Sequence, residues 1–367
     1  MRPANGRTTA PALHLRGVLL PDEEHRDLWV RDGRLTFEPV AGAQTLAERG
    51  WVVPGLVDAH CHVGLQEDGP VADLDVAREQ ARADRDGGAL LLRDAGSPMD
   101  TRPLLDEPDL PRLIRAGRHI ARPRRYLRNY AAEVEPADLA DEVRRQAAYG
   151  DGWVKLVGDW IDRDAGDLAP LWPAAALAEA VGVAHDAGAR VAVHCFATET
   201  IPDLLAAGVD CIEHGTGLTD DLIAELVARG TTLTSTTLVA ATLSDIADRA
   251  QERFPAYAHR MRAMAAGYPA VLRSAYEAGV TIHVGSDAGG VLPHGLISHE
   301  IAALHAAGVP ADDALAAGSW AARAWLGLPG LEEGAPADLV VYAEDPRADL
   351  SVLGRPDRIV LRGRVVR

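Results

Sequence analysis

Six side chains able to bind a metal ion occur along the chain, each at or near the end of a short apolar run. They are His60, His62, Lys155, His194, His214 and Asp287. Imidazole and carboxylate donors together suit zinc, and they are also compatible with manganese, iron or cobalt. His60 and His62 are two residues apart, so on an extended backbone their rings point to the same side and can hold one ion. The types and spacing of these residues therefore predict a metal site.

Each candidate taken alone also has an ordinary structural explanation. An HxH pair is a weak signal by itself, and a single strand histidine is more often a hydrogen-bonded core residue. Asp287, which precedes Ala-Gly-Gly, is compatible with a simple turn. Six further histidines fall in expected tails, helices or loops and are expected to bind no metal: His14, His25, His119, His185, His259 and His305.

The hydrophobic pattern predicts the elements that would position the candidates. Eight short apolar runs alternate with alanine-rich helical stretches. The runs cover residues 55–60, 89–95, 112–120, 153–158, 190–196, 210–215, 231–236 and 281–287. This alternation predicts an α/β fold, a (β/α)8 TIM barrel, in which the third strand has the weakest signal. Active sites of such barrels lie at the C-terminal ends of the strands, where the six candidates fall.

Both ends of the chain have a β pattern instead. Residues 1–53 begin with a loose tail over 1–10 and continue with alternating runs joined by polar turns, including an Asp-Gly at Asp32. Residues 331–367 return to this pattern in ADLVVYAE and RIVLRGRVV. We therefore expect a barrel over residues 54–330 and a small composite β-sandwich domain built from 1–53 and 331–367.

The composition is that of a globular protein, with 47% hydrophobic and 25% charged residues. The formal net charge of −17 argues against nucleic acid or an anionic membrane surface as a partner. The sequence shows neither a signal-like start nor an apolar run of membrane length. With only three cysteines, these features predict a cytoplasmic protein that acts on a small molecule, and a homo-oligomer is compatible with them.

Five motifs, in their order along the chain, resemble those of the amidohydrolase superfamily. The motifs are PGLVDAHCHVG, GWVKLVG, VAVHCFA, CIEHG and HVGSDAGG. The branch they resemble most is that of the imidazolonepropionase-like and prolidase-like hydrolases. In addition, GAPADLVVYAEDPRADL followed by RIVLRGRVV is similar to the C-terminal return of that family to its β-sandwich. The resemblance covers nearly the whole chain, and it specifies the superfamily much more closely than the substrate.

The resemblance implies a centre with two divalent metal ions, with zinc as the first expectation. A more buried ion would be held by His60, His62 and Asp287. A more exposed ion would be held by His194 and His214. Between them, Lys155 would form a bridge as a carbamate, made by its amine with carbon dioxide.

Lys155 suits this role on physical grounds as well. It is the only lysine among 37 lysine and arginine residues, and apolar residues flank it. Burial beside cations lowers a lysine pKa and yields the neutral amine that carbamylation requires, whereas a guanidinium stays charged. The structural alternative is a snorkelling or salt-bridged amine near Asp159 or Asp162.

A centre of this kind predicts a hydrolase. A water shared by two metal ions has a pKa lowered toward neutrality, and the bridging hydroxide can attack a polarised carbonyl. Asp287 would accept the proton and deliver it to a leaving nitrogen. The expected reaction is hydrolysis of a C–N bond in an amide, peptide or cyclic amide, although a lactone, ester or phosphotriester would suit the same site.

Two other functions remain open on the sequence. A deaminase of the same superfamily with one metal would usually lack the lysine and carry a glutamate soon after the fifth-strand histidine. Glu199 follows His194 by five residues, but its position favours an acid at a helix N-terminus. A metal-free binding protein would have lost ligands, and none of the six is lost.

The substrate contacts are the least determined feature. The segment ARPRRYLRNY after the third strand places four arginines around Tyr126: Arg122, Arg124, Arg125 and Arg128. They are either a solvated surface or a clamp for a substrate carboxylate, with Tyr126 and Arg128 as candidate contacts. His294 is a candidate for contacting the substrate or stabilising the oxyanion, or an ordinary loop histidine.

Overall fold

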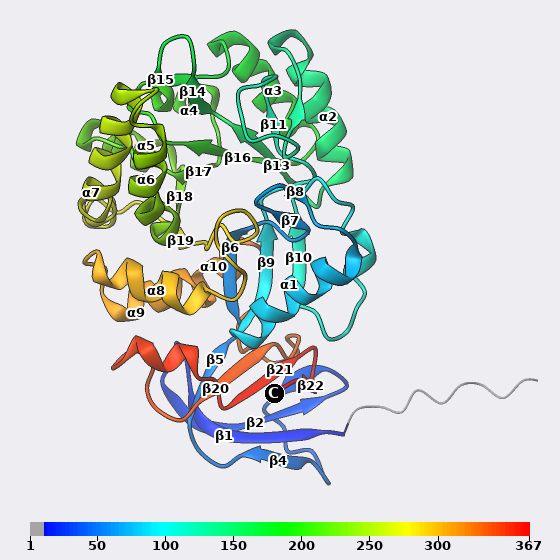
Figure 1. Cartoon of the computed structure of the whole chain (residues 1–367). Helices are drawn as coiled ribbons and strands as arrows, with labels where there is room; N and C mark the ends of the chain where they lie inside the picture. The colour runs from blue at the N-terminus through cyan, green and yellow to red at the C-terminus, as the bar shows by residue number, and fades with distance from the viewer. Residues whose placement is uncertain (1–10) are drawn as a thin grey trace, which may run out of the picture.

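The computed structural model describes residues 11–367, and it places a sheet built from both chain ends beneath an α/β region (Figure 1). The strands of this sheet are β1 (Leu13–Leu19), β2 (Glu24–Arg31), β3 (Arg34–Thr36), β4 (Gln44–Ala47), β5 (Trp51–Pro54), β20 (Leu339–Tyr342), β21 (Arg358–Leu361) and β22 (Arg364–Val365). Their order is β22-β21-β20-β5-β1-β2-β3, and β4 pairs with β1. Strands from the two ends meet where β20 runs antiparallel to β5, with Leu339 opposite Pro54.

The second group of strands carries the candidate residues, and these strands pair in parallel. They are β6 (Leu56–Cys61), β9 (Ala89–Asp94), β10 (Arg112–Arg115), β11 (Ile120–Ala121), β13 (Trp153–Val157), β16 (Arg190–Cys195), β17 (Cys211–His214), β18 (Thr232–Ser235) and β19 (Ile282–Val284). They form the sequences β10-β9-β6 and β11-β13-β16-β17-β18-β19, with the short β12 (Ala132–Glu133) beside β11. A parallel bridge from Cys61 to Ala288 links β6 to the segment after β19. At the other junction, the backbone N–H of Asp151 donates to the carbonyl of Arg115 at 2.7 Å.

The third run differs most from the strand expected there. A single strand over 112–120 is wrong, because the run divides into β10 and β11. Gly117 lies between them with φ +73°, a conformation that glycine adopts without strain. The two pieces can therefore pair with different neighbours, β10 with β9 and β11 with β13.

Helices follow most of the parallel strands. They are α1 (Leu74–Asp86), α2 (Leu139–Tyr149), α3 (Ala174–Asp186), α4 (Ile201–Ala207), α5 (Asp220–Arg229), α6 (Thr237–Ala250), α7 (Pro255–Glu277), α8 (Ile297–Ala306), α9 (Ala311–Ala317) and α10 (Trp320–Trp325). The short strands β7 (Leu65–Gln66), β8 (Gly69–Pro70), β14 (Asp159–Asp162) and β15 (Asp167–Pro170) form two hairpins. Every residue of β6, β9 and β13 is buried, as expected for parallel strands covered on both faces.

Register along the parallel strands brings the candidate residues to one end of the sheet. Val157, at the end of β13, is opposite His194 of β16, and Cys195 is opposite His214 of β17. The ends of β13, β16 and β17 therefore lie side by side.

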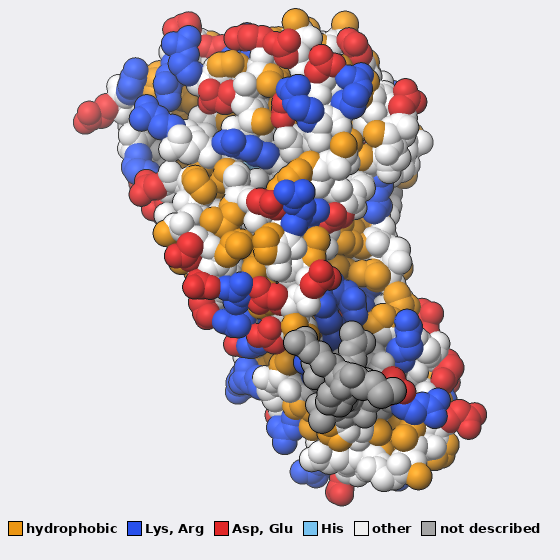
Figure 2. All heavy atoms as spheres, turned by 90° about the vertical axis from the view of Figure 1, so that its right-hand side faces the viewer, with side chains coloured by type: hydrophobic (Ala, Val, Ile, Leu, Met, Phe, Trp, Pro, Cys, Tyr) orange, Lys and Arg blue, Asp and Glu red, His pale blue; other side chains and the backbone are white. Residues whose placement is uncertain are grey.

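Neither the face drawn in Figure 2 nor the helices within residues 11–367 indicate a second kind of functional surface. Figure 2 shows side chains of both charges interspersed with apolar ones over one face, which is ordinary for a globular protein. Within residues 11–367, no helix combines the length and apolar character needed to cross a bilayer.

Candidate metal centre

His60 and His62 present the same ring nitrogen toward one point. The Nδ1 of His60 lies 2.6 Å from a carboxylate oxygen of Glu213, and the Nδ1 of His62 lies 2.6 Å from the carbonyl oxygen of Gly96. Both partners accept hydrogen bonds, so each Nδ1 carries the proton and each Nε2 keeps its lone pair in the neutral ring. The two Nε2 atoms are 3.3 Å apart. Both imidazoles are thus oriented as metal ligands.

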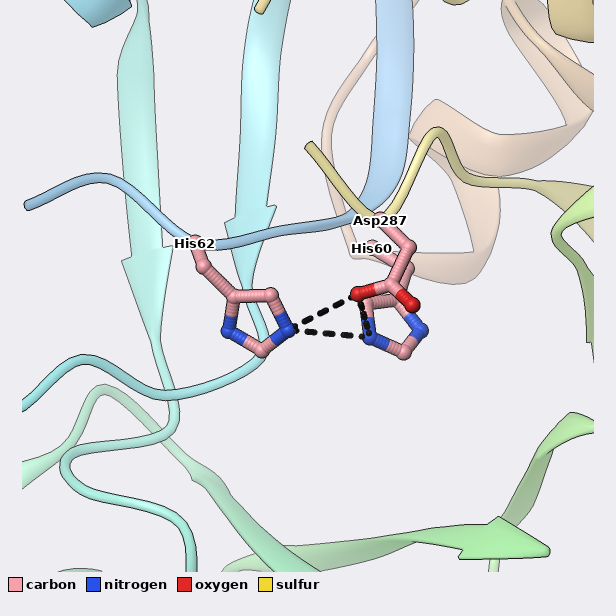
Figure 3. Close-up of side chains that lie close together, drawn as sticks. All are labelled: His60, His62 and Asp287. Carbon is pink, nitrogen blue, oxygen red and sulfur yellow. Dashed lines mark hydrogen bonds and ion pairs between the residues drawn. The ribbon is translucent and has the colours of Figure 1, made fainter. Parts of the chain in front are cut away.

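Asp287 completes this group. Its Oδ1 lies 3.0 Å from the Nε2 of His62 and 3.2 Å from that of His60, and the three donors converge in Figure 3. One ligand atom from each residue falls within a common span of 4.8 Å. The motif HVGSDAGG owes two glycines to this packing, because a Cβ at Gly285 would meet His60 and one at Gly289 would meet the backbone of His62. Three donors facing one another without a proton between them fit a cation.

His194 and His214 lie beside this group. Their ring centroids are 4.7 Å apart, and the ring of His214 is 5.2 Å from that of His60. The Nδ1 of His214 pairs with the hydroxyl of Thr236 at 2.7 Å. Burial lowers the pKa of His214 to about 3 and that of His194 well below its usual value. Both rings are therefore neutral near pH 7, which is the form that binds a metal.

Lys155 lies on β13 inside the same region and is 3% exposed. Its Nζ is 3.9 Å from a carboxylate oxygen of Glu213, but it makes no hydrogen bond to any residue in 11–367. Burial is the main cause that lowers the pKa of Lys155 to about 8. About a tenth of this amine is then neutral at pH 7, far more than for an ordinary lysine, which favours the carbamate chemistry expected from the sequence.

Glu213 is a site residue that the sequence did not single out. It is fully buried, and its second oxygen accepts from the Nη2 of Arg93 at 2.7 Å. The guanidinium of Arg93 also lies against the rings of Trp153 and Trp325, with its Cζ 4.6 and 5.1 Å from their centroids. Burial alone would raise the pKa of Glu213, but Arg93 and Lys155 hold it well below its usual range. The carboxylate therefore links His60, Lys155 and Arg93 as a permanent anion.

Strand alternation hides Glu213 in the sequence. Neighbouring strand residues normally point to opposite faces, so Glu213 and His214 are not expected in one site. His214 has φ +66°, however, which breaks the alternation at the end of β17. The feature of the sequence that could have indicated Glu213 is a charged residue inside a short run that is predicted to be a buried strand.

His119, one of the six histidines expected to bind no metal, lies between β10 and β11, next to the centre. Its ring centroid is 5.6 Å from that of His62 and 5.4 Å from that of Tyr126. The residue is 1% exposed, and neither ring nitrogen has a hydrogen-bond partner within residues 11–367. Burial lowers the pKa of His119 well below its usual value. A buried ring with two unpartnered nitrogens is a candidate substrate contact.

His294 lies in the loop before α8, which is compatible with the loop histidine that the sequence left open. Its Nδ1 lies 2.7 Å from the carboxylate of Asp84 on α1, and its side chain is 3% exposed. It does not line the cavity described next. Its Nε2 is also buried without a hydrogen-bond partner in residues 11–367 and is available to another group. A role for His294 in catalysis stays a prediction.

A cavity of about 240 Å³ lies against His62, His194 and Asp287. Tyr126 lines it, and its role as a substrate contact stays a prediction. The four arginines around Tyr126 do not line it. Arg125 instead binds Asp162 at 3.0 Å and donates to the carbonyl oxygens of Trp160 and Ala169. Its guanidinium holds the β14–β15 hairpin.

Glu199 is remote from the donors. It lies in the 3-10 turn Thr198–Thr200 before α4, and its carboxylate binds Arg260 at 2.7 Å near the surface. This placement agrees with the interpretation of Glu199 as an acid at a helix start.

Comparison with known proteins identifies the family. The model of the amidohydrolase family matches residues 106–366. The chain belongs to the amidohydrolase family. It is a hydrolase that acts on carbon–nitrogen bonds, and the resemblance seen in the five motifs is confirmed. Uncharacterized proteins of Mycobacterium tuberculosis and Mycobacterium bovis are each 54% identical to this amidohydrolase over 364 residues, which cover 98% of this chain and 96% of each relative.

Solved structures show the fold of the prolidase-like branch. A putative prolidase from Bifidobacterium longum aligns with a TM-score of 0.83 at 23% identity, covering 97% of this amidohydrolase and 94% of that chain. An Xaa-Pro dipeptidase with bound methionine aligns with a TM-score of 0.82 at 21% identity, covering 96% and 99%. The ochratoxinase of A. niger gives 0.78 at 18% identity, covering 97% and 95%. The TIM-barrel fold expected from the sequence is that of these neighbours.

Proposed function

We propose that this amidohydrolase hydrolyses a C–N bond in an amide, peptide or cyclic amide of a small molecule, with two divalent metal ions as cofactors. The observation that carries the proposal is the convergence of His60, His62 and Asp287 within 4.8 Å, beside a cavity. Nitrogen and oxygen donors of this kind suit zinc first, with manganese, iron or cobalt as alternatives. Bound ions would supply the Lewis acidity that activates a water and polarises a carbonyl.

The residues divide into two groups of ligands. We assign His60, His62 and Asp287 to the more buried ion and His194 and His214 to the more exposed one. Lys155 would bridge the ions as a carbamate. Its buried Nζ without a hydrogen bond supports this assignment, because an unsolvated ammonium at this place is costly unless it is converted or neutralised.

Asp287 has the position required of a proton carrier. It lines the cavity and also faces the ring nitrogens of His60 and His62. A cation held between Asp287 and the two ring nitrogens would favour the ionised form of the carboxyl and so lower its pKa. The carboxylate is therefore ionised, and it would take the proton from the attacking water and pass it to the leaving nitrogen.

Histidine side chains are available to contact the substrate carbonyl. We propose His119 first, because it lies beside His62 with both nitrogens unpartnered in residues 11–367. His294 is the second candidate, and Tyr126 would contact the substrate inside the cavity.

The sheets support a division of the chain into two domains. We propose a closed (β/α)8 barrel over residues 54–330 and a composite β-sandwich domain from 1–53 and 331–367, since strands of both ends share one sheet. The three cysteines are free and buried, which supports a cytoplasmic location.

Metal analysis and a hydrolysis screen test the proposal together. The metal-replete protein is expected to hold two ions per chain and to release an amine from one class among dipeptides, N-acyl amino acids and cyclic amides. Mass spectrometry under non-denaturing conditions should show the carbamate on Lys155. Cleavage of lactones or esters alone would move the reaction away from C–N bonds. One ion at full occupancy with release of ammonia would support a deaminase instead.

A further inference from the structure

His214 adopts a backbone conformation that is unfavourable for a residue with a side chain. Its φ is +66°, in the left-handed region, and the next residue, Gly215, has φ +64°. Left-handed backbone brings Cβ close to the following carbonyl oxygen, so it is costly for histidine but not for glycine. Such strained positions persist only where the surrounding structure holds them. A contact from elsewhere in the fold must therefore hold the peptide of His214.

This conformation is what turns the ring of His214 into the centre. The carboxylate of Glu213 lies 2.6 Å from the ring of His60, and the ring centroid of His214 lies 5.2 Å from that of His60. Two successive strand residues would ordinarily point to opposite faces. If His214 relaxed to an extended backbone, its ring would turn away from His60 and His194. The position of the ring thus depends on the peptide that follows it.

The hydroxyl of Tyr268 binds that peptide. Tyr268 lies on α7 and is 1% exposed, and its hydroxyl donates to the carbonyl oxygen of His214 at 2.5 Å. Burial raises the pKa of Tyr268, so the phenol keeps its proton and stays a donor near neutral pH. Rotation of the peptide would leave a buried donor and a buried acceptor without partners, which is costly. Tyr268 therefore opposes the relaxation of His214.

The ring of His214 is held from the same part of the chain. Its Nδ1 pairs with the hydroxyl of Thr236 at 2.7 Å, and Thr236 immediately precedes α6. Helices α6 and α7 lie side by side (Figure 1) and share an apolar cluster that includes Leu243 and Tyr257. The α6–α7 hairpin thus contacts His214 at two points, the ring through Thr236 and the backbone through Tyr268.

We propose that Tyr268 is a positioning residue, which holds His214 in its left-handed conformation and so keeps the ring available to the more exposed metal ion. It acts through the backbone of His214 and does not line the cavity. The proposal rests on the proposed role of His214 as a ligand. It adds to the centre a residue that lies 54 positions further along the chain.

The metal affinity of a variant without the hydroxyl tests the proposal. Tyr268→Phe keeps the ring and removes the hydrogen bond. Zinc binding to the metal-free protein, measured by competition with a chelator, should become about 10- to 100-fold weaker for one ion and stay unchanged for the other. The visible spectrum of the cobalt-loaded protein, which responds to the number of ligands, should change as well. Unchanged zinc affinity for every ion would overturn the proposal.

Two matched variants separate positioning from a loss of stability. Tyr342 is fully buried and its hydroxyl has no partner in residues 11–367, so Tyr342→Phe removes the same atom without breaking a bond. The hydroxyl of Ser319 donates to the carbonyl of Pro54 at 2.8 Å, so Ser319→Ala breaks a similar bond beside the start of β6. Both variants should bind zinc as the wild type does, although Ser319→Ala should unfold at a lower denaturant concentration. An equal loss of zinc affinity in Ser319→Ala and Tyr268→Phe would indicate general destabilisation and refute the positioning role.

A double variant shows whether Tyr268 acts through His214. His214→Ala removes the ring but keeps the carbonyl that Tyr268 binds. In this background Tyr268→Phe should still raise the equilibrium constant for unfolding by about fivefold or more. It should cause no further loss of zinc affinity, because the ring that it positions is absent. A further loss of about tenfold or more would mean that Tyr268 affects the metal by another route, contrary to the proposal.

These measurements need no hydrolysis, so the proposal and the proposed function can fail separately. One ion per chain, bound more weakly in Tyr268→Phe than in the wild type, would support the positioning role and contradict the centre with two ions. Two ions and amide hydrolysis, with equal zinc affinity in Tyr268→Phe and the wild type, would exclude the role of Tyr268 and leave the proposed function in place.

Discussion

The buried carboxylate of Glu213 is the most informative residue to perturb. Glu213→Gln keeps the shape of the side chain and removes its charge. One oxygen now accepts from His60 at 2.6 Å and the other from Arg93 at 2.7 Å. A glutamine has a single acceptor oxygen, so its NH2 group must face either the His60 Nδ1–H or the guanidinium. One of these donors loses its partner in either orientation.

The stability cost follows from the burial of the pair. Arg93 and Glu213 are both 0% exposed, and within residues 11–367 the one further side-chain hydrogen bond of Arg93 goes to Thr234, at 3.2 Å. Breaking a buried pair by neutralising one member costs about 3–5 kcal/mol. Denaturant unfolding of the metal-free protein should show this loss in Glu213→Gln. The exposed pair Glu225–Arg229 provides the control, because Glu225→Gln should cost less than about 0.5 kcal/mol.

The metal affinity should change independently of the fold. Without an acceptor at Nδ1, the proton of His60 is no longer held there, and Nε2 is no longer fixed as the free ligand atom. Zinc affinity, measured by competition with a chelator, is therefore expected to fall by about 10- to 100-fold. In the double variant Arg93→Met with Glu213→Gln, the amide oxygen is free to accept from His60, and most of the stability and zinc affinity should return. A Glu213→Gln protein with the stability and zinc affinity of the wild type would refute this account of the site.

Three further predictions concern the centre and its surroundings. Lys155→Arg places a permanent cation where a bridging anion is expected, and like charges a few ångströms apart cost several kcal/mol even at an effective dielectric of about 20. Elemental analysis should therefore show that metal is lost, and assays should show that turnover is lost, while the circular dichroism spectrum stays unchanged. Retention of both metals and of activity would rule out Lys155 as the bridge. Asp287→Asn still offers an oxygen but cannot accept a proton, so kcat should fall by about two to four powers of ten while metal content falls less, and near-normal kcat in the metal-loaded variant would exclude the proton-carrier role. Burial raises the pKa of Glu300, which accepts from the backbone N–H groups of Thr237 and Leu238 at the start of α6, to about 7. Between about pH 4.5 and 7 the folded state therefore holds a proton that the unfolded state has released. The contribution of Glu300 to the free energy of unfolding should decline as pH rises through this range, measured as the difference between the wild type and Glu300→Gln. A difference that does not depend on pH would contradict the raised pKa.

Much of the framework follows from local patterns in the sequence. The alternation of apolar runs and helices predicts the parallel strands, and the β pattern of both ends predicts strands that the structure finds in one sheet. The motifs also identify the family, because they carry their own backbone requirements: Gly285 and Gly289 allow close contact with His60 and His62. Such requirements are local, so they can be read along the chain.

Tertiary structure alone decides which partners these residues have. The bond from Glu213 to Arg93 joins residues 120 positions apart, and no periodicity connects them. Arg125 and Arg249 are equally charged in the sequence, but folding pairs the first with Asp162 and leaves the second beside the cavity. His119, expected from the sequence to bind no metal, lies beside His62 where the chain passes from β10 to β11. The burial and the ion pairing of a side chain depend on segments that are distant along the chain. They determine which charged groups are available for binding and catalysis.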